Sequence, residues 1–333
     1  STEGQSVTLV YVDSTQGWLN TMDSTSNVRG AGFVTATGGT PCTGAICGDY
    51  KTHTFTGPGT FCVSAIAPCA SDNVVDYLIV GGGGAGAGRP NGGGVGGGGA
   101  GGVRVGTASA SPTIPLSAPG YTVSVAPYAI VVGGGGANDP TANPAGASGN
   151  LSSGFSLAGA GGGGGTTAGN PGIAGGSGGG AGESPSSTSG GAGNTPPVSP
   201  PQGNGGGNST CGSYGAGGGG IGGAGVNATS PMNSTKGAGG PGSDFGAVFG
   251  TANGTPGGFF AGGGGGSKGG SAYGQTAAPG GGGVGGENGG LTATAGGTNT
   301  GGGGGGNGVN NPAPGSESSA GGSGVVIIRY KFQ

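Results

Sequence analysis

Long uninterrupted runs of glycine constrain this chain more than any other feature of its sequence. Glycine has no side chain to bury, so a glycine run gains nothing from the burial of apolar surface. Each residue that becomes ordered also loses about 1–2 kcal/mol of backbone conformational free energy. Contacts between backbones are all that remains to offset this loss. The runs lie at residues 81–84, 92–94, 96–99, 133–136, 161–165, 178–180, 205–207, 217–220, 262–266, 280–283 and 301–306.

Such runs predict a body of packed polyglycine II helices. Each of these extended helices has about 3 residues per turn and rises about 3.1 Å per residue. Without Cβ atoms the helices can lie side by side and exchange N–H···O=C and Cα–H···O contacts with several neighbours. Polar segments rich in Asn, Pro, Ser and Thr separate the runs, which indicates back-and-forth threading with connections at both ends. We therefore expect glycine to be required for packing here, not for flexibility.

The first run also matches a nucleotide-binding motif. Gly81, Gly83 and Gly86 fit G-x-G-x-x-G and follow an apolar stretch, residues 74–80. That motif needs a helix next, because the helix N-terminus holds the pyrophosphate. Residues 92–102 are nearly all glycine, and glycine costs a helix about 1 kcal/mol per residue relative to alanine. The acidic residue that binds the ribose is also missing from the expected position. The sequence therefore predicts no nucleotide cofactor.

Composition excludes several other classes of protein. The chain has 333 residues, of which 102 are Gly and 22 are Pro, a composition often found in disordered segments. Disordered tails are normally charged, yet only seven charged residues lie between residues 105 and 328. Collagen is excluded because there is no strict G-X-Y repeat. The net charge of −3 gives no support for nucleic-acid binding. The longest apolar runs are too short to span a membrane.

The glycine content changes abruptly at Val80/Gly81. Residues 1–80 hold 10 of the 102 glycines, so we predict an antiparallel β domain over residues 1–80 and a glycine-rich body over residues 81–333. Trp18 is expected in or at the edge of the core of the β domain. The predicted fold class is an all-β N-terminal domain followed by packed polyglycine II helices, with short framing strands and essentially no α-helix. The strands are expected at residues 7–12, 33–37, 50–56, 61–64, 75–80, 120–125, 128–132 and 324–330.

Two pairings are predicted among these strands. The turn sequence Gly57-Pro58-Gly59 is expected to fold residues 61–64 back onto residues 50–56. The last strand, residues 324–330, is expected to pair with residues 75–80. This second pairing brings the end of the glycine-rich body back to its beginning.

Cysteine and histidine offer little catalytic chemistry. Cys42, Cys47, Cys62 and Cys69 are close in sequence, and we favour two local disulfides, Cys42–Cys47 and Cys62–Cys69, over free thiols or a metal site. His53 is the only histidine and lies in a predicted strand, where a structural role is the more common one. Without a partner histidine or paired carboxylates in a readable motif, no catalytic residues, metal or cofactor are predicted, and the protein is not expected to be an enzyme.

Several stretches together resemble bacteriophage tail-fibre proteins with a C-terminal glycine-rich domain. The resemblance extends over essentially the whole chain. It implies rigid polyglycine II rods whose variable distal loops bind a host receptor, either a glycan or an outer-membrane protein. It also implies an extracellular place on the virion, contacts with the fibre shaft or other virion proteins, and either a homotrimer or a single chain on a trimeric shaft. The stretches are residues 11–18 (YVDSTQGW), 33–40 (FVTATGGT), 53–61 (HTFTGPGTF), 75–84 (VDYLIVGGGG) and 322–330 (GSGVVIIRY).

Aromatic residues between the glycine runs are the candidates for receptor binding, because Tyr and Phe carry much of the energy of interfaces. The alternative interpretation is that they cover the sides of the rods as small apolar cores. Tyr214 and Tyr273, with polar neighbours, fit binding better than the phenylalanines do. The candidates are Tyr214, Tyr273, Phe245, Phe249, Phe259 and Phe260. The competing functions are a structural virion fibre or decoration protein and an extracellular filament subunit, both without a specific ligand.

Overall fold

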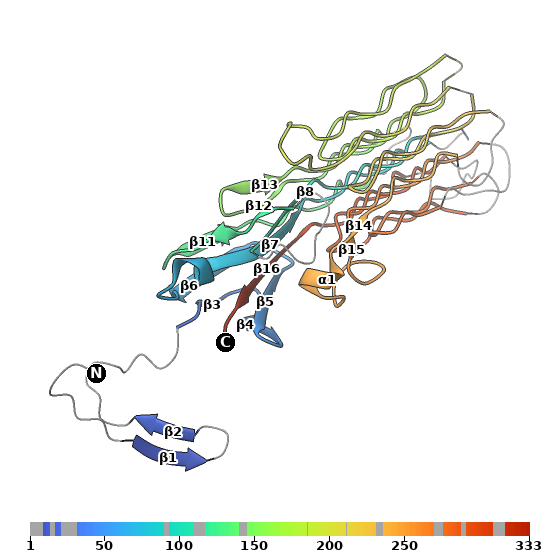
Figure 1. Cartoon of the computed structure of the whole chain (residues 1–333). Coiled ribbons are helices and arrows are strands. Elements are labelled where there is room, and N and C mark those ends of the chain that lie inside the picture. The colour runs from blue at the N-terminus through green and yellow to red at the C-terminus, as the bar shows by residue number, and fades with distance from the viewer. Residues whose placement is uncertain are drawn as a thin grey trace.

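The fold was analysed in a computed structural model of the chain (Figure 1). β-Strands gather at one end of the glycine-rich body, which we call the sheet end, and long rods without regular strand pairing run away from it to the far end. Within the described part, no helix has the length and apolar character needed to cross a membrane. The structure describes residues 9–13, 17–20, 32–89, 93–108, 117–139, 145–184, 186–210, 212–230, 236–269, 276–287, 291–308 and 317–333.

The largest sheet is built around β7 (Val74–Val80) and β16 (Val325–Lys331). These strands are antiparallel, with Val80 opposite Val325 and Asp76 opposite Arg329, which confirms the predicted pairing of the end of the body with its beginning. The change from strand to rod falls at Val80/Gly81. The strand order is β4 (Thr40–Cys47), β5 (Tyr50–Phe55), β16, β7, β8 (Val103–Thr107) and β9 (Ala118–Pro119), with β10 (Tyr121–Thr122) also beside β7. The sheet therefore joins strands from both sides of the predicted domain boundary.

The other strands form smaller sheets around the large one. A three-stranded sheet has the order β11 (Pro127–Ile130), β6 (Gly59–Ala65) and β3 (Thr35–Thr37). A turn of 3-10 helix, η1 (Ala70–Asn73), precedes β7, and the four-residue α1 (Gly246–Phe249) is the α-helix of the described residues. The two-stranded sheets are β1 (Leu9–Asp13) with β2 (Gly17–Asn20), β12 (Ser152–Gly154) with β13 (Leu157–Gly159), and β14 (Ser243–Asp244) with β15 (Phe259–Phe260). The structure thus consists mostly of strands and irregular segments with essentially no α-helix. This agrees with the predicted fold class.

Two details of the predicted β domain are corrected or left open. The strand β6 does not pair back onto β5; it pairs with β3 and β11 instead, because Phe61 and Val63 on its alternate positions pack against the large sheet. Trp18 lies in β2, opposite Tyr11 of β1. Its side chain lies outside the described part of the structure.

Apolar side chains cover both faces of the large sheet. Side chains alternate between the two faces of a strand, so β7 and β16 each contribute to two cores. One core holds Tyr77, Ile79 and Ile328 together with Phe61 of β6. The other lies on the opposite face and holds Leu78 and Ile327 with residues from α1 and β15. The sheet end is therefore stabilised in the usual way, by burial of apolar side chains.

The rods are held together by backbone hydrogen bonds that rotate through their neighbours. In the first rod, residues 81–89, the amides of Gly81, Gly84 and Ala87 donate to rod 93–102, those of Gly82 and Ala85 to rod 145–150, and those of Gly83 and Gly86 to rod 317–324. The N···O distances are 2.8–3.0 Å. The carbonyls of the same rod accept bonds from Gly136, Gly162, Gly165, Gly304 and Asn307, which belong to three further rods. The repeat of three is that of the predicted polyglycine II helix, and it gives this rod six hydrogen-bonded neighbours.

The absence of side chains is what allows the rods to approach one another. A Cβ atom added to Gly98 would lie 2.1 Å from the carbonyl oxygen of Gly84, and one added to Gly264 would lie 2.1 Å from that of Gly304. Real Cβ atoms do not come within 3.0 Å of a backbone atom. Glycine at these positions is therefore required for packing, because the obstacle is the neighbouring backbone, which cannot rotate away.

Candidate binding face at the far end of the rods

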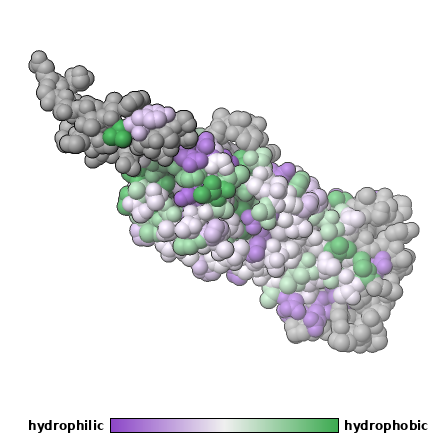
Figure 2. Space-filling model, turned by 90° about the horizontal axis from the view of Figure 1, so that it is seen from below, coloured by the Kyte–Doolittle hydropathy of each residue, from purple (hydrophilic) through white to green (hydrophobic). Residues whose placement is uncertain are grey.

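Charged residues of the glycine-rich body are concentrated at its far end. Of the eleven charged residues in residues 81–333, seven lie where a rod meets a connection at that end. The other four, Arg104, Asp244, Arg329 and Lys331, lie in strands at the sheet end. In Figure 2 hydrophilic and hydrophobic residues lie side by side next to the grey atoms at this end, as they do at the sheet end, with mostly pale surface between the two ends. We call this surface the far face. Its residues are Arg89, Asp139, Glu183, Tyr214, Lys236, Lys268, Glu287 and Glu317.

The threading of the chain explains why the charges meet. At most glycine positions inside the rod bundle an added Cβ atom would collide with a neighbouring backbone, so long side chains are tolerated mainly at the rod ends and on the outside. Rods that leave the sheet end terminate at Arg89, Asp139, Glu183, Lys268 and Glu287. Residues far apart in the sequence are thereby brought to one surface.

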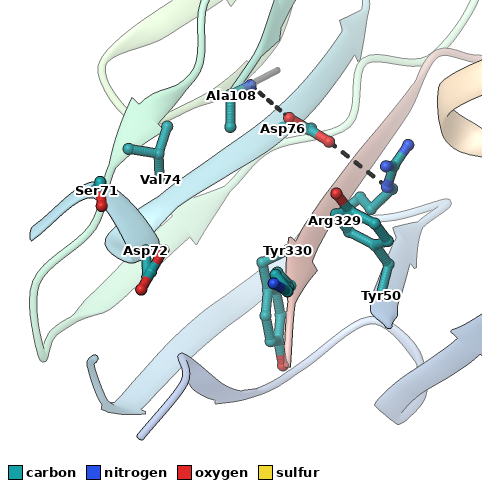
Figure 3. A pocket seen from close by; sticks show the side chains of 9 residues that line it. Tyr50, Ser71, Asp72, Val74, Asp76, Ala108, Arg329 and Tyr330 are labelled. Carbon is teal, nitrogen blue, oxygen red and sulfur yellow. Dashed lines mark hydrogen bonds and ion pairs between the residues drawn. The ribbon is translucent and has the colours of Figure 1, made fainter. Parts of the chain in front are cut away.

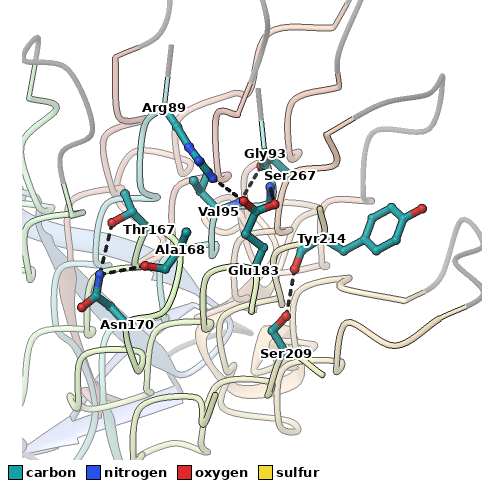
Figure 4. Close-up of polar contacts among 11 residues, drawn as sticks. Arg89, Gly93, Val95, Thr167, Ala168, Asn170, Glu183, Ser209, Tyr214 and Ser267 are labelled. Atoms are coloured by element: carbon teal, nitrogen blue, oxygen red, sulfur yellow. Dashed lines mark hydrogen bonds and ion pairs between the residues drawn. The ribbon is translucent and has the colours of Figure 1, made fainter. Parts of the chain in front are cut away.

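An ion pair between Arg89 and Glu183 ties three rods together (Figure 4). The guanidinium of Arg89 contacts Oε1 of Glu183, while Oε2 accepts a hydrogen bond from the amide of Gly94 at 2.9 Å. Gly93 has a φ of +138°, and a Cβ atom there would collide with the Arg89 side chain. The pair therefore fixes the ends of the rods that flank the first connection of the body.

Tyr214 lies beside a buried lysine on the same face. The ammonium of Lys268 is 5.6 Å from the centre of the Tyr214 ring, a cation–π distance. The backbone of Lys268 also forms β-bridges with both Tyr214 and Glu287. The Tyr214 carbonyl accepts a hydrogen bond from the Ser209 hydroxyl at 3.0 Å, and the ring points away from the rods in Figure 4. Tyr214 as a whole is half-buried.

A third group of polar contacts on the far face surrounds Glu317. Its carboxylate accepts a hydrogen bond from the side-chain amide of Asn138 at 3.2 Å, and its carbonyl accepts one from Asn307 at 2.9 Å. The Asp139 amide donates to the Ser318 hydroxyl at 2.6 Å. Three more rods are thus joined at their ends by polar side chains, of which Asn307 and Ser318 are buried.

A described turn between two rods shows how such connections are built. Residues 168–170 join two rods at the far end, and the hydroxyl of Thr166 donates to the carbonyl of Asn170 at 2.8 Å. The Asn170 side chain donates to the carbonyl of Ala168 at 3.2 Å (Figure 4). Connections on a rigid platform are where binding residues commonly lie. Among the described residues, no group of three or more His, Cys, Asp or Glu side chains is placed to hold a metal ion.

A cavity of about 190 Å³ at the sheet end was considered as a second candidate site (Figure 3). It is lined by Asp76 and Arg329, which lie opposite each other on β7 and β16. Burial raises the pKa of the Asp76 carboxyl, although the Ala108 amide and Arg329 act against this shift. Both carboxylate oxygens are engaged, one by the Ala108 amide at 2.6 Å and the other by Arg329 Nε at 3.5 Å. The pair thus fastens strands together.

Most of the aromatic candidates lie away from the far face. Phe245, Phe249 and Phe260 are buried in the second core of the sheet, at the sheet end, and Phe259 beside them is half-buried. The expectation of receptor contact is corrected for the three buried rings, because a residue without exposed surface cannot touch a partner; they follow the alternative interpretation of apolar packing. Tyr273 lies outside the described residues. Of the six candidates, Tyr214 is the one that the structure places on the far face.

The four clustered cysteines are free and exposed in the structure, so the predicted disulfides are not formed. Cys42 and Cys47 lie in one strand, β4, whereas a local disulfide needs a turn that brings its two residues together. The sulfur of Cys69 forms a hydrogen bond with the Ser71 hydroxyl at 3.0 Å. The structure therefore corresponds to the second alternative, free thiols.

Sequence reasoning missed the charged residues of the far face. Glu183, Glu287 and Glu317 are separated by many residues, and distance in sequence concealed that they lie at the same end of the rod bundle. The signal was present nonetheless, because each of them lies at the boundary of a glycine-rich rod. In a chain that threads back and forth, every second connection between rods lies at the same end of the bundle. Residues next to those connections therefore share that end.

Comparison with known proteins gives one match. Residues 54–331 match the family model described as a glycine-rich domain. The matched region begins in β5 and ends at the last residue of β16, and these two strands pair with each other. No curated protein matches the chain.

Proposed function

The chain belongs to the glycine-rich domain family, and from this premise we propose that it is the receptor-binding tip of a bacteriophage tail fibre. The far face binds a receptor on the host cell surface, either a glycan or an outer-membrane protein. The observation that carries the proposal is the presence of seven charged residues and Tyr214 at one end of a scaffold built largely of glycine. Resemblance of the stretches at both ends of the chain to tail-fibre proteins supports the viral context.

The scaffold suits a protein whose binding residues must change. The rods are held by backbone hydrogen bonds, so replacing a residue in a far-end connection disturbs no apolar core. With Lys268 buried, the described residues of the far face offer carboxylates, the Lys236 ammonium and amides together with the ring of Tyr214. Such groups suit a polar receptor surface. The sheet end then faces the fibre shaft or other virion proteins, with the protein as a homotrimer or as a single chain on a trimeric shaft.

The test is binding of the purified, fluorescently labelled chain to bacteria from the source environment, with the virus as competitor. We expect saturable binding and protection of the cells from infection. The alanine substitution Tyr214→Ala is expected to weaken binding about tenfold or more, as for an interface aromatic residue at the centre of a contact. The matched control is Ile46→Ala, which removes an exposed side chain at the sheet end and should leave binding unchanged.

Other results would favour a different function. Absence of binding to every permissive host would contradict the proposal and favour a structural virion fibre, decoration protein or filament subunit. Equal loss from Tyr214→Ala and Ile46→Ala would place the receptor contact away from the far face.

A further inference from the structure

A cavity on the side of the body is not used by the far face or by the rod packing. It has a volume of about 690 Å³ and lies where the β12–β13 hairpin, the nearby rods and the segment before Gln202 meet. Small-molecule sites commonly have volumes of about 300–1,000 Å³. The cavity is therefore large enough for a ligand.

The walls of the cavity are mainly apolar. Val131, Leu151, Leu157 and Val198 line it. The residues Leu151 and Val131 are 51% and 42% exposed, and both are large hydrophobic residues. An apolar molecule that covers them gains about 25 cal/mol for each Å² removed from water.

The cavity walls are held in place before any ligand binds. The Gln202 side chain donates to the carbonyl of Pro196 at 2.7 Å and accepts from the amide of Ala160 at 2.9 Å. Asn194 exchanges hydrogen bonds with Val198, at 3.1 Å in each direction. On the other side, Phe155 in the β12–β13 turn stacks on Tyr121 with ring centres 4.7 Å apart. Because the wall is already ordered, less conformational entropy is lost when a ligand binds.

One cation lines this apolar cavity. The guanidinium of Arg104 donates to the carbonyls of Pro200 at 2.9 Å and Ser199 at 3.2 Å, which are neutral acceptors. Among the described residues, no carboxylate forms an ion pair with Arg104. A guanidinium has five N–H donors and binds carboxylates well. The charge of Arg104 is thus available to an anionic group at the edge of the apolar wall.

We propose that this cavity binds a single-chain fatty carboxylate. The hydrocarbon chain lies on Leu151, Leu157 and Val131, and the carboxylate pairs with Arg104. This site is separate from the far face and does not depend on the function proposed above. Charge complementarity with Arg104 favours this ligand over an uncharged or cationic amphiphile.

The test is calorimetric titration of the full chain with dodecanoate, with dodecanol and dodecyltrimethylammonium as ligands of the same chain length. We expect saturable binding of one dodecanoate, weaker binding of dodecanol and no binding of the cation. The substitution Arg104→Gln should weaken dodecanoate binding about tenfold or more, the loss of one charge-assisted contact, and leave dodecanol unchanged. The charge-retaining Arg104→Lys should keep most of the affinity.

Two further variants separate the ligand site from general effects. Leu151→Ala should weaken dodecanoate and dodecanol about equally, because it removes apolar contact from both. Lys331→Gln removes a positive charge outside this cavity and should change neither. Failure of the unaltered chain to bind dodecanoate saturably, or equal binding of the cationic amphiphile, would overturn the proposal. Should Arg104→Gln unfold the chain, the comparison of the three ligands and Leu151→Ala still decides.

Discussion

The sheet end and the rods solve the same problem of stability by opposite means. At the sheet end, β7 and β16 bury apolar side chains on both faces, as with Ile327 and Ile328. In the rods, residues such as Gly98 are useful because they have no side chain, and the neighbouring backbone occupies the space where one would be. The two regions should therefore respond to substitutions of opposite kinds. Removing atoms should harm the sheet end, and adding atoms should harm the rods.

The largest effect is expected from Gly98→Val in the middle of a rod. The new Cβ atom would lie 2.1 Å from the carbonyl oxygen of Gly84, so a whole rod must move. Ordinary overpacking costs about 1–3 kcal/mol, and displacement of a rigid backbone costs more, so we expect a loss of about 5 kcal/mol or failure to fold. Thermal and denaturant unfolding measure this. An unchanged melting temperature would contradict the expectation that added atoms destabilise the rods.

A somewhat smaller effect is expected from Ile327→Ala at the sheet end. Its side chain is fully buried between strands and the α1 region, so truncation leaves a cavity. We expect a loss of about 3 kcal/mol in the free energy of unfolding, measured by denaturant unfolding. The exposed Ile46, on β4 of the same sheet, provides the control, because Ile46→Ala should cost little. Similar losses from both substitutions would show that burial does not stabilise this end.

A smaller effect, dependent on pH, is expected from His53. Its ring is fully buried between Gly38 and Tyr330. Burial lowers its pKa below the usual 6.5, the charge of Lys51 acts in the same direction, and the hydrogen bond to Gly38 opposes them. The unfolded chain therefore binds a proton more readily than the folded chain, so stability should fall as the pH drops below about 6.5.

The pH effect is measured by denaturant unfolding between pH 7.5 and 5. Replacement by His53→Gln removes the titrating group and should flatten the profile in this range. Because other groups titrate in both proteins, the difference between the two profiles is decisive, and a wild-type stability that does not fall relative to His53→Gln toward acid would contradict the assignment. The buried Asp76 titrates with the opposite sign, because its raised pKa favours the folded state as the pH falls through that value.

The smallest effect is expected from Gly134→Ala, a substitution within the rods. Gly134 belongs to a rod, yet a Cβ atom there would approach only the Asn150 side chain, at 3.8 Å. Gly134→Ala is therefore expected to be neutral or to stabilise the chain by about 0.4–1 kcal/mol, since alanine restricts the unfolded chain. Its neighbour Gly135 faces the carbonyl oxygen of Gly321 at 2.0 Å. Gly135→Ala should be clearly destabilising, and equal results for the two would show that packing contacts do not decide.

Some of this architecture follows from local sequence, and some does not. The pairing of β7 with β16 was predictable because both are apolar runs joined directly to glycine-rich segments. The rods were predictable because glycine runs have few other ways to become ordered. The partner of β6 was not, because it depends on which distant strands bury Phe61. The surroundings of Phe245 and Phe260 were hidden for the same reason, since their core is completed by β7 and β16.

The far face illustrates the same limit for the site. Tyr214 was identified from its polar neighbours, but the pairing of Arg89 with Glu183 required the threading to be known. Alternation of direction between successive rods is visible in the sequence only as a tendency. The exact boundaries decide which end a residue reaches, and these depend on turns such as residues 168–170, which local composition does not specify.

The three-residue rotation of hydrogen bonds also limits how such a molecule can change in length. Inserting one or two residues into a rod would turn every later amide toward the wrong neighbour. An insertion of three, adding about 9 Å, turns each later amide toward the same neighbouring rod, one turn further along it. The connections at the rod ends obey no such count and can gain or lose any number of residues. Proteins descended from this chain should therefore differ in rod length by multiples of three residues. The lengths of their connections should vary without such a restriction.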